Sequence, residues 1–197
     1  MPMREAVAPT GPTRPTRERI IETAARMTAE FGWSRVTMGA LAEEVGVSRQ
    51  TVYNEVHSRD ELAEAMIMRE LLVFLAAVEQ GFDRHPDDAA QAVRAATRGV
   101  LELAADNELL RAVVSGTQGE DTDLLPLLTT RSQSLLSIAT SVVHDRLAAY
   151  DLALTNAELD GAVDMIVRTV LGHVVQPSGA PRATADAVGR AAQRLLG

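Results

Sequence analysis

Residues 37–66 read TMGALAEEVGVSRQTVYNEVHSRDELAEAM, and this stretch contains two short helical patterns separated by a glycine. Thr37 and Ser48 are residue types that cap helix N-termini. Gly46 supplies the left-handed backbone conformation that a tight turn between two helices requires. The sequence therefore predicts short helices over residues 37–45 and 48–54, joined by a glycine turn.

The second of these helices carries side chains suited to DNA bases. Two helices joined by a short turn form a helix-turn-helix, whose second member enters the major groove by its N-terminal residues. Arg49 can bridge O6 and N7 of guanine, Gln50 can pair with adenine, and the methyl group of Thr51 can touch thymine. Free amides at the helix starts near Thr37 and Arg59 suit phosphates. The alternative is an ordinary corner between two helices.

The same stretch resembles the signature of TetR-type transcriptional regulators. The matching positions are Thr37, Leu41–Ala42, Val45–Gly46–Val47–Ser48, Val52–Tyr53, Ser58–Arg59 and Leu62. Val56 stands where that family usually has phenylalanine, which predicts slightly looser packing, and Arg59 replaces the usual lysine without loss of charge. The resemblance covers residues 17–66 and implies a DNA-contacting set made of Thr37, Ser48, Arg49, Gln50, Thr51, Tyr53, His57 and Arg59.

Several of these assignments have alternatives. Tyr53 could instead be a core aromatic with a hydrated hydroxyl, and His57 could be a solvated loop residue. Residues 1–15 contain four prolines and little apolar material, which is typical of a mobile arm. The arginines at 14, 17 and 19 could add phosphate or minor-groove contacts from this arm, or make none.

The rest of the chain shows helical spacing and no strand pattern. Ile20, Ala24, Met27 and Phe31 repeat at helical intervals before Gly32. Ser58 and Glu61 form the pattern of a capping box. The predicted fold is all-α, with a flexible arm (1–15), a helix-turn-helix domain (16–58) and a larger helical domain for ligand binding and dimerisation (59–197). The nine helices are expected over 16–31, 37–45, 48–54, 59–84, 87–105, 107–115, 123–150, 156–175 and 183–196.

Charge divides the chain into two parts. Residues 1–60 hold 8 Arg and 8 acidic residues, whereas residues 61–197 hold 11 and 19, and the formal net charge of the whole is −8. An acidic C-terminal part is repelled by polyphosphate, so DNA contact is expected only from the N-terminal part. Cysteine is absent and no apolar run reaches the length of a bilayer span. These features predict a cytoplasmic protein without membrane segments, metal or cofactor.

The C-terminal helices are expected to form a homodimer and enclose a ligand. A TetR-like dimer would place on its interface the apolar stripes Leu159, Val163, Ile166, Val170, Val174, Val188, Ala191 and Leu195; alternatively, these stripes pack within one chain. An aliphatic lining with few aromatic residues favours a small hydrophobic effector. The candidate ligand-binding residues are Met66, Phe74, Arg98, Asn107, Gln133, His144 and Arg168, although each could equally be a structural or surface residue.

These expectations combine into one function. The resemblance implies a regulator, usually a repressor, that binds double-stranded DNA at a palindromic operator as a homodimer and is released by a small hydrophobic effector. A rival is a ligand-sensing helical dimer that acts through a protein partner with an idle helix-turn-helix. An enzyme is not expected, because Ser141, His144 and Asp145 lack an oxyanion hole and lie on one short helical segment.

Overall fold

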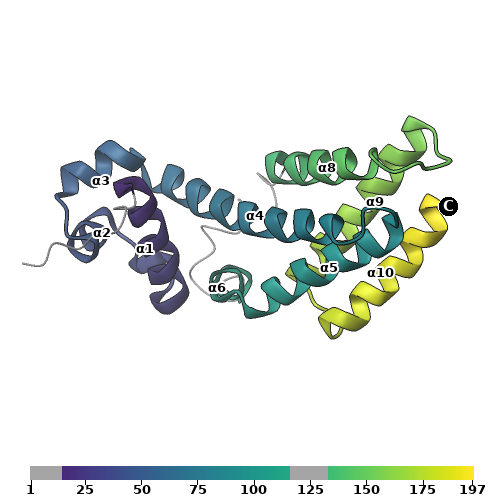
Figure 1. Ribbon diagram of the computed structural model, residues 1–197. Helices are drawn as coiled ribbons and strands as arrows, with labels where there is room; N and C mark the ends of the chain where they lie inside the picture. The colour runs from purple at the N-terminus through teal and green to yellow at the C-terminus, as the bar shows by residue number, and fades with distance from the viewer. Residues whose placement is uncertain (1–14, 116–132) are drawn as a thin grey trace, which may run out of the picture.

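The computed structural model describes residues 15–115 and 133–197, and within them every regular element is helical (Figure 1). The all-α prediction is therefore confirmed. The elements are α1 (Thr16–Phe31), a 3-10 turn η1 (Trp33–Arg35), α2 (Met38–Val45), α3 (Arg49–Val56), α4 (Arg59–Asp83), α5 (Ala89–Asp106), α6 (Glu108–Ser115), α8 (Gln133–Leu147), α9 (Asn156–Val175) and α10 (Pro181–Leu196). None of the helices in these two ranges is long and apolar enough to span a membrane.

Hydroxyl side chains cap the N-termini of α2, α3 and α4, as the sequence predicts. The side-chain oxygens of Thr37 and Ser48 accept hydrogen bonds from backbone amides three residues later, at 3.1 and 3.0 Å. Ser58 caps α4 in the same way, at 3.1 Å from the amide of Glu61. The expected capping box is nevertheless incomplete, because the Glu61 carboxylate lies 3.0 Å from His57 and 3.7 Å from Arg17. Each cap satisfies an amide that the first helical turn leaves free.

Apart from α8, every helix begins and ends within two residues of its expected range. α3 continues to Val56, two residues beyond the expected end, since Val56 is fully buried and extends the packed face. The helix expected over 123–150 is described from Gln133 to Leu147. Its expected first residues lie in 116–132, outside the described part of the chain.

A first core holds the N-terminal domain together at one end of the elongated molecule (Figure 1). Ile20, Ala24 and Met27 of α1 are buried in it, as their spacing predicts, but Phe31 is 55% exposed at the end of the helix. α2, α3 and the first turns of α4 complete this core. Two residues of α6, Leu109 and Val113, also belong to it, although they are distant in sequence.

A second core occupies the C-terminal part, where α4 packs on α5 and α8, and α9 and α10 pack on α5 and on each other. The backbones of α4 and α5 approach closely at Gly81, where an added Cβ would lie 2.3 Å from the backbone nitrogen of Ala96. Arg146 of α8 ties this body to α4 through ion pairs with Glu79, at 2.8 Å, and with Asp83. The long helix α4 therefore belongs to both cores and connects them.

The stripes expected at a dimer interface are mostly buried within this chain. Leu159, Val163, Ile166 and Val188 are at most 8% exposed, and Val170, Val174 and Leu195 are half-buried against the same core. Ala191 alone of this set is exposed. The expectation is thus wrong for the buried residues, because α5 and α8 cover the apolar faces of α9 and α10.

Candidate nucleic-acid interface and ligand cavity

The outer face of α3 presents the side chains that the sequence assigns to DNA. Arg49 and Gln50 are exposed, and Tyr53 is 43% exposed, which excludes its alternative assignment to the core. Gln50 donates a hydrogen bond from Nε2 to Oδ1 of Asn54 at 2.9 Å. Asn54 was not expected in this set, although its position one helical turn after Gln50 places it on the same face.

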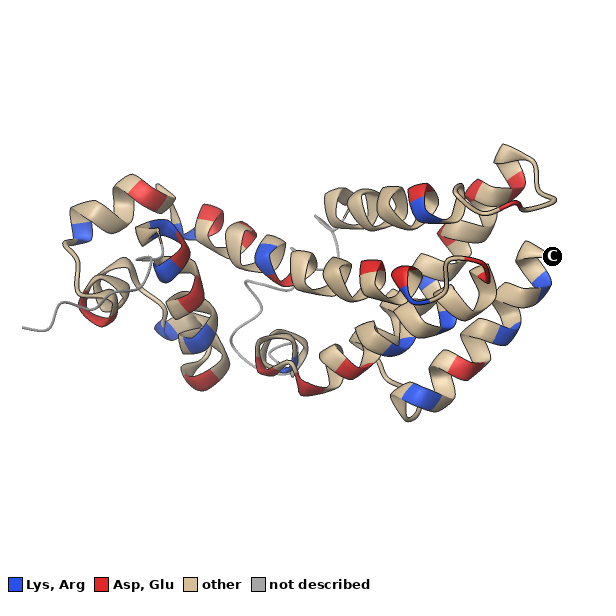
Figure 2. Cartoon of the chain, viewed as in Figure 1, with Lys and Arg blue, Asp and Glu red and all other residues tan. Residues whose placement is uncertain are grey.

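The inner side of the same unit fixes the angle between α2 and α3. Leu41 and Val52 are fully buried and Val45 is 6% exposed, as the sequence predicts. Gly46 ends α2 with φ 73° and ψ 41°, the left-handed conformation expected for it. The hydroxyl of Ser48 caps α3 and lies 2.8 Å from that of Thr51. This packing leaves the other face of α3 exposed at the surface of the domain, and Figure 2 shows the basic position at the start of this helix in blue.

Two arginines close to this surface, Arg17 and Arg19, bind the protein's own backbone. An Nη of Arg19 donates to the carbonyl of Val45 at 2.6 Å, and Nε of Arg17 donates to the carbonyl of Glu55 at 3.2 Å. Both therefore cap helix C-termini, where cations are favoured. Arg14, the third residue of the expected arm set, lies outside the described residues.

Arg59 also departs from its expected place. Its guanidinium donates to the carbonyl of Trp33 at 2.5 Å and lies 4.6 Å from the centroid of the Trp33 ring. The side chain is thus directed into the domain and not toward a phosphate, because hydrogen bonding and the aromatic face both attract it. Its backbone amide remains at the start of α4. Arg35, which the sequence did not single out, is exposed two residues before Thr37.

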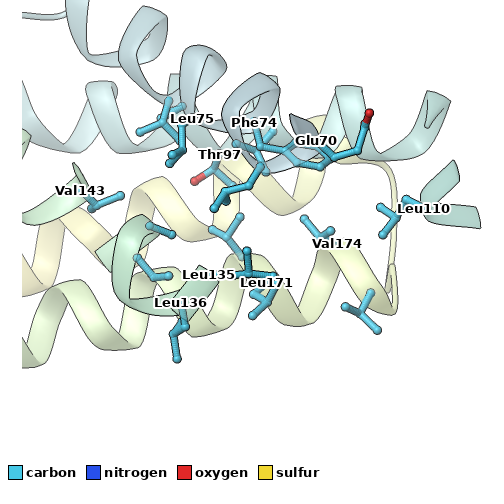
Figure 3. A pocket seen from close by; sticks show the side chains of 18 of the residues that line it. Glu70, Phe74, Leu75, Thr97, Leu110, Leu135, Leu136, Val143, Leu171 and Val174 are labelled. Carbon is cyan, nitrogen blue, oxygen red and sulfur yellow. The ribbon is translucent and has the colours of Figure 1, made fainter. Parts of the chain in front are cut away.

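A cavity of about 200 Å³ lies in the C-terminal body (Figure 3). Its wall is built from α4, α5, α6, α8 and α9 and is almost entirely aliphatic, with Phe74 and Phe82 as aromatic members. Of the seven candidate ligand-binding residues, Phe74 and Asn107 line it. A concave apolar space with few polar groups is typical of small-molecule sites.

The other five candidates lie elsewhere. Met66 is buried in the first core. Arg98 is exposed and bound to Glu102 at 2.7 Å, a hydrogen bond that raises the pKa of Arg98. Arg168 is exposed and pairs with Asp164 at 2.8 Å on its own helix. Gln133 and His144 line a shallow polar hollow between α8 and α9, where His144 lies 3.1 Å from Asp160.

One end of the cavity carries a polar chain that reaches the N-terminal domain. Asn107 donates from Nδ2 to Oε2 of Glu70 at 2.6 Å, and Glu70 lies 3.3 Å from Arg69. Arg69 in turn lies 3.7 Å from Glu22 of α1. Asn107 also caps α6, accepting from the amide of Leu110 at 2.7 Å. Glu70 and Arg69 were not expected here, since nothing in the spacing of α4 distinguishes them from surface residues.

The cavity and the N-terminal core share a wall. Ile67, Leu109 and Val113 line the cavity and at the same time belong to the first core. α6 packs directly on α1. The wall of the cavity is therefore in direct contact with the helix that supports the helix-turn-helix.

Ser141, His144 and Asp145, the side chains that the sequence considered for an enzyme site, all lie on α8. Ser141 and His144 both face the polar hollow, but His144 is paired with Asp160 and lies 3.9 Å from Asp145. No group of three or more metal-ligating side chains gathers in residues 15–115 and 133–197.

The family assignment follows from two matches that together span both halves of the chain. Residues 88–194 match the model described as the bacterial tetracycline repressor C-terminal domain, and residues 20–66 match the bacterial regulatory proteins of the tetR family. The chain belongs to the TetR family. The resemblance seen in residues 17–66 is thereby confirmed, and TetR proteins are transcriptional regulators, not enzymes.

Individual TetR relatives agree with this assignment. The HTH-type transcriptional regulator AlkX of Mycobacterium tuberculosis is 26% identical over 161 residues, covering 82% of this chain and 75% of the relative. The crystal structure of the TetR family repressor AlkX from a Dietzia species, implicated in biodegradation of n-alkanes, has a TM-score of 0.74 at 25% identity and covers 94% of this chain and 97% of the other. The repressor QsdR of Rhodococcus erythropolis shares the fold, with a TM-score of 0.61, 23% identity and coverage of 94% and 96%.

Proposed function

We propose that this TetR-family protein is a ligand-responsive repressor that binds a palindromic operator as a homodimer and releases it when a small hydrophobic effector fills the cavity. The observation that carries the proposal is the shared wall, in which Ile67, Leu109 and Val113 contact both the cavity and the core beneath the helix-turn-helix. A cavity isolated from that core would offer no route from ligand to DNA.

The DNA contacts are assigned to the outer face of α3 and the starts of α2 and α4. Arg49, Gln50 and Thr51 would face bases, and Tyr53 and the capped amides after Thr37 would bind phosphates. Asn54 is added to the base-facing set because it holds the Gln50 amide. Ser48 positions the helix through its cap, while His57, paired with Glu61, lies beside the phosphate-facing start of α4.

The dimer interface is assigned to the exposed faces of α9 and α10. The exposed small and apolar residues there are Ala157, Gly161, Met165, Gly172 and Val175 on α9, and Ala183, Ala187 and Ala191 on α10. Small residues at helical spacing permit close approach of a second pair of helices. Two helices from each chain would then form a four-helix contact across a two-fold axis.

The mechanism is an equilibrium between two dimer shapes. In the DNA-bound shape the two α3 helices enter successive major grooves, about 34 Å apart when the half-sites are one turn apart. An effector in the cavity displaces α6 and the N-terminal half of α4, and the spacing changes. Affinity for the operator falls by the factor with which the effector prefers the second shape. The association of the Dietzia relative with n-alkanes supports an aliphatic effector.

The proposal is tested by selecting bound fragments from sheared genomic DNA of the source organism. The wild-type protein should enrich one palindrome, whereas Arg49→Ala, which removes a base-reading side chain, should not. Arg98→Ala is the matched control, because Arg98 is an exposed arginine on the C-terminal body. Enrichment that persists in Arg49→Ala would reject α3 as the reading helix, and no enrichment by the wild type would favour the rival with an idle helix-turn-helix.

A further inference from the structure

Two threonines are the buried polar residues of the described chain, and their hydroxyl groups differ in hydrogen bonding. Thr28 is 2% exposed and Thr97 is 3% exposed. The Thr28 hydroxyl donates to the carbonyl of Ala24 at 2.7 Å, the bond that a threonine inside a helix often makes with the residue four positions earlier. Thr97 lies inside α5, yet its hydroxyl bonds neither to Val93, four positions earlier, nor to any other described residue. A buried hydroxyl in this state costs stability unless a further group binds it.

Thr97 lies in the wall of the cavity, with apolar residues on both sides of it along α5. Val93 and Ala96 precede it in the lining, and Val100 follows it. Its hydroxyl oxygen is not sealed off completely, so it opens into the space that the side chain lines. Figure 3 shows this oxygen on the side of the cavity where Leu75 lies. The cavity wall therefore presents one open hydroxyl within an aliphatic surface.

The other polar residues of the described lining are bound to the protein and lie elsewhere. Asn107 donates to Glu70 at 2.6 Å and accepts from the amide of Leu110 at 2.7 Å. In Figure 3 the Glu70 carboxylate points away from the other lining side chains, on the side toward Leu110. A water molecule in an apolar cavity needs about two to four polar partners, and this part of the described wall offers Thr97 alone. An oxygen carried on a hydrocarbon needs only that one bond, because its carbon chain lies against the apolar wall.

We propose that Thr97 is the polar anchor of the cavity, and that the cavity binds an aliphatic alcohol or ketone whose single uncharged oxygen bonds the Thr97 hydroxyl. This inference rests on the proposed function and deepens it by naming the chemical class of the effector. A threonine hydroxyl both donates and accepts, so it suits a carbonyl oxygen as well as a hydroxyl group. A carboxylate suits the site less well, because one neutral hydrogen bond does not offset the burial of a charge, and none of the described lining residues is a cation.

The test changes the ligand and the protein together, because a hydrogen bond between them makes the two changes non-additive. Titration calorimetry and thermal shift give the affinity of the purified full-length protein for 2-octanone, 1-octanol, octane and octanoate. Thr97→Val removes the hydroxyl and keeps the shape of the side chain. It should weaken the binding of octanone and octanol by about tenfold, a difference of about 1.4 kcal/mol, and leave the binding of octane unchanged or tighter.

Two further variants separate the hydrogen bond from an effect on packing. Thr97→Ser keeps the hydroxyl and should retain the wild-type ratio of octanone affinity to octane affinity. Thr28→Val is the matched control, since it makes the same change at a buried threonine of α1 whose hydroxyl is already bonded, and it should also retain this ratio. The urea midpoint of the ligand-free protein should not fall in Thr97→Val, because no described group loses a partner.

Several results would overturn the inference. These are an equal effect of Thr97→Val on octanone and octane, tighter binding of octanoate than of octanone by the wild type, a lower urea midpoint in Thr97→Val, and no binding of any of the four compounds. Operator binding is measured separately. If octanoate rather than octanone releases the operator, the proposed function stands and the inference about Thr97 fails. Octanone binding that depends on Thr97, without any operator binding, supports the anchor and rejects the proposed function.

Discussion

The arginines of the N-terminal domain divide at the residue scale into those that face outward and those that bind the protein. Arg49 is exposed at the start of α3, whereas Arg17 and Arg19 donate to carbonyls at helix ends. The sequence identified Arg49 correctly as an outward side chain because helical periodicity decides which face it occupies. It did not distinguish the others, since a carbonyl acceptor from another helix becomes available only after packing.

Arg59→Ala and Arg49→Ala should change different properties, the first the stability of the fold and the second the affinity for the operator. Loss of the Arg59 hydrogen bond to Trp33 and of its contact with the ring should lower the free energy of unfolding by about 1–3 kcal/mol, with little change in the salt dependence of operator binding. Arg49→Ala should leave unfolding unchanged and cost about 1–3 kcal/mol in operator affinity. Urea unfolding and operator titrations at several salt concentrations measure both. A smaller salt slope with unchanged stability in Arg59→Ala would restore Arg59 to the phosphate contacts.

The candidate ligand residues show how far the surroundings of a side chain can be predicted from its neighbours in the sequence. Arg98 and Arg168 were expected near a ligand, but each pairs with an acid four residues away on its own helix. Those acids, Glu102 and Asp164, are visible in the sequence, and exposed pairs at this spacing are common on helix surfaces. Asn107 does line the cavity, yet its contact with Glu70 depends on how α4 and α5 cross, which no local pattern encodes.

At the element scale, the helix starts were predictable and the helix partners were not. Thr37, Ser48, Ser58 and Thr155 all cap helices because an N-cap depends only on residues within one turn. The stripe of α9 was correctly recognised as apolar, but Val163 is buried within its own chain. Periodicity shows that a helix buries one face and leaves open whether the covering helix belongs to the same chain.

The crossing of α4 and α5 gives a prediction at this scale. Gly81→Ala should lower the free energy of unfolding by about 1–3 kcal/mol, because the new Cβ would lie 2.3 Å from the Ala96 backbone nitrogen, which cannot move without shifting α5. Gly99→Ala, on the other helix of the same pair, meets Ala77 at an ordinary 3.4 Å and should be neutral or up to about 1 kcal/mol stabilising. Equal urea midpoints for the two variants would contradict the close approach.

At the scale of the whole molecule, the exposed faces of α9 and α10 are the ones that we assign to the dimer interface. Ala187→Glu places a charge on the face assigned to the dimer, where burial without a partner is costly. Its dimer dissociation constant should rise by about a hundredfold or more, since a buried unpaired charge costs about 3–5 kcal/mol. Ala105→Glu makes the same change on an exposed position of α5 and should leave the dimer intact. Sedimentation velocity over a range of concentrations separates the outcomes, and a dimer that survives Ala187→Glu would move the interface elsewhere.

The proposed coupling between the cavity and DNA binding also involves the whole molecule. Two valines of the cavity wall allow this coupling to be tested separately from ligand contact. Val113 and Val143 both line the cavity and are 6% and 7% exposed, but Val113 belongs to the core beneath the helix-turn-helix and Val143 to the core of the C-terminal body. Truncation to alanine removes a similar contact with the ligand in either case. Only Val113→Ala also loosens α6 from α1.

The ratio of operator dissociation constants with and without a saturating cavity ligand measures this communication directly. A coupling of about 1–3 kcal/mol corresponds to a ratio of about 5–150 in the wild type. Val113→Ala should bring the ratio close to one, while Val143→Ala, although it weakens ligand binding, should keep the wild-type ratio once the ligand saturates. If both variants lose the coupling equally, ligand contact alone controls release. If neither does, the signal must leave the cavity through α4 rather than α6, because α4 is the helix that has residues in both cores.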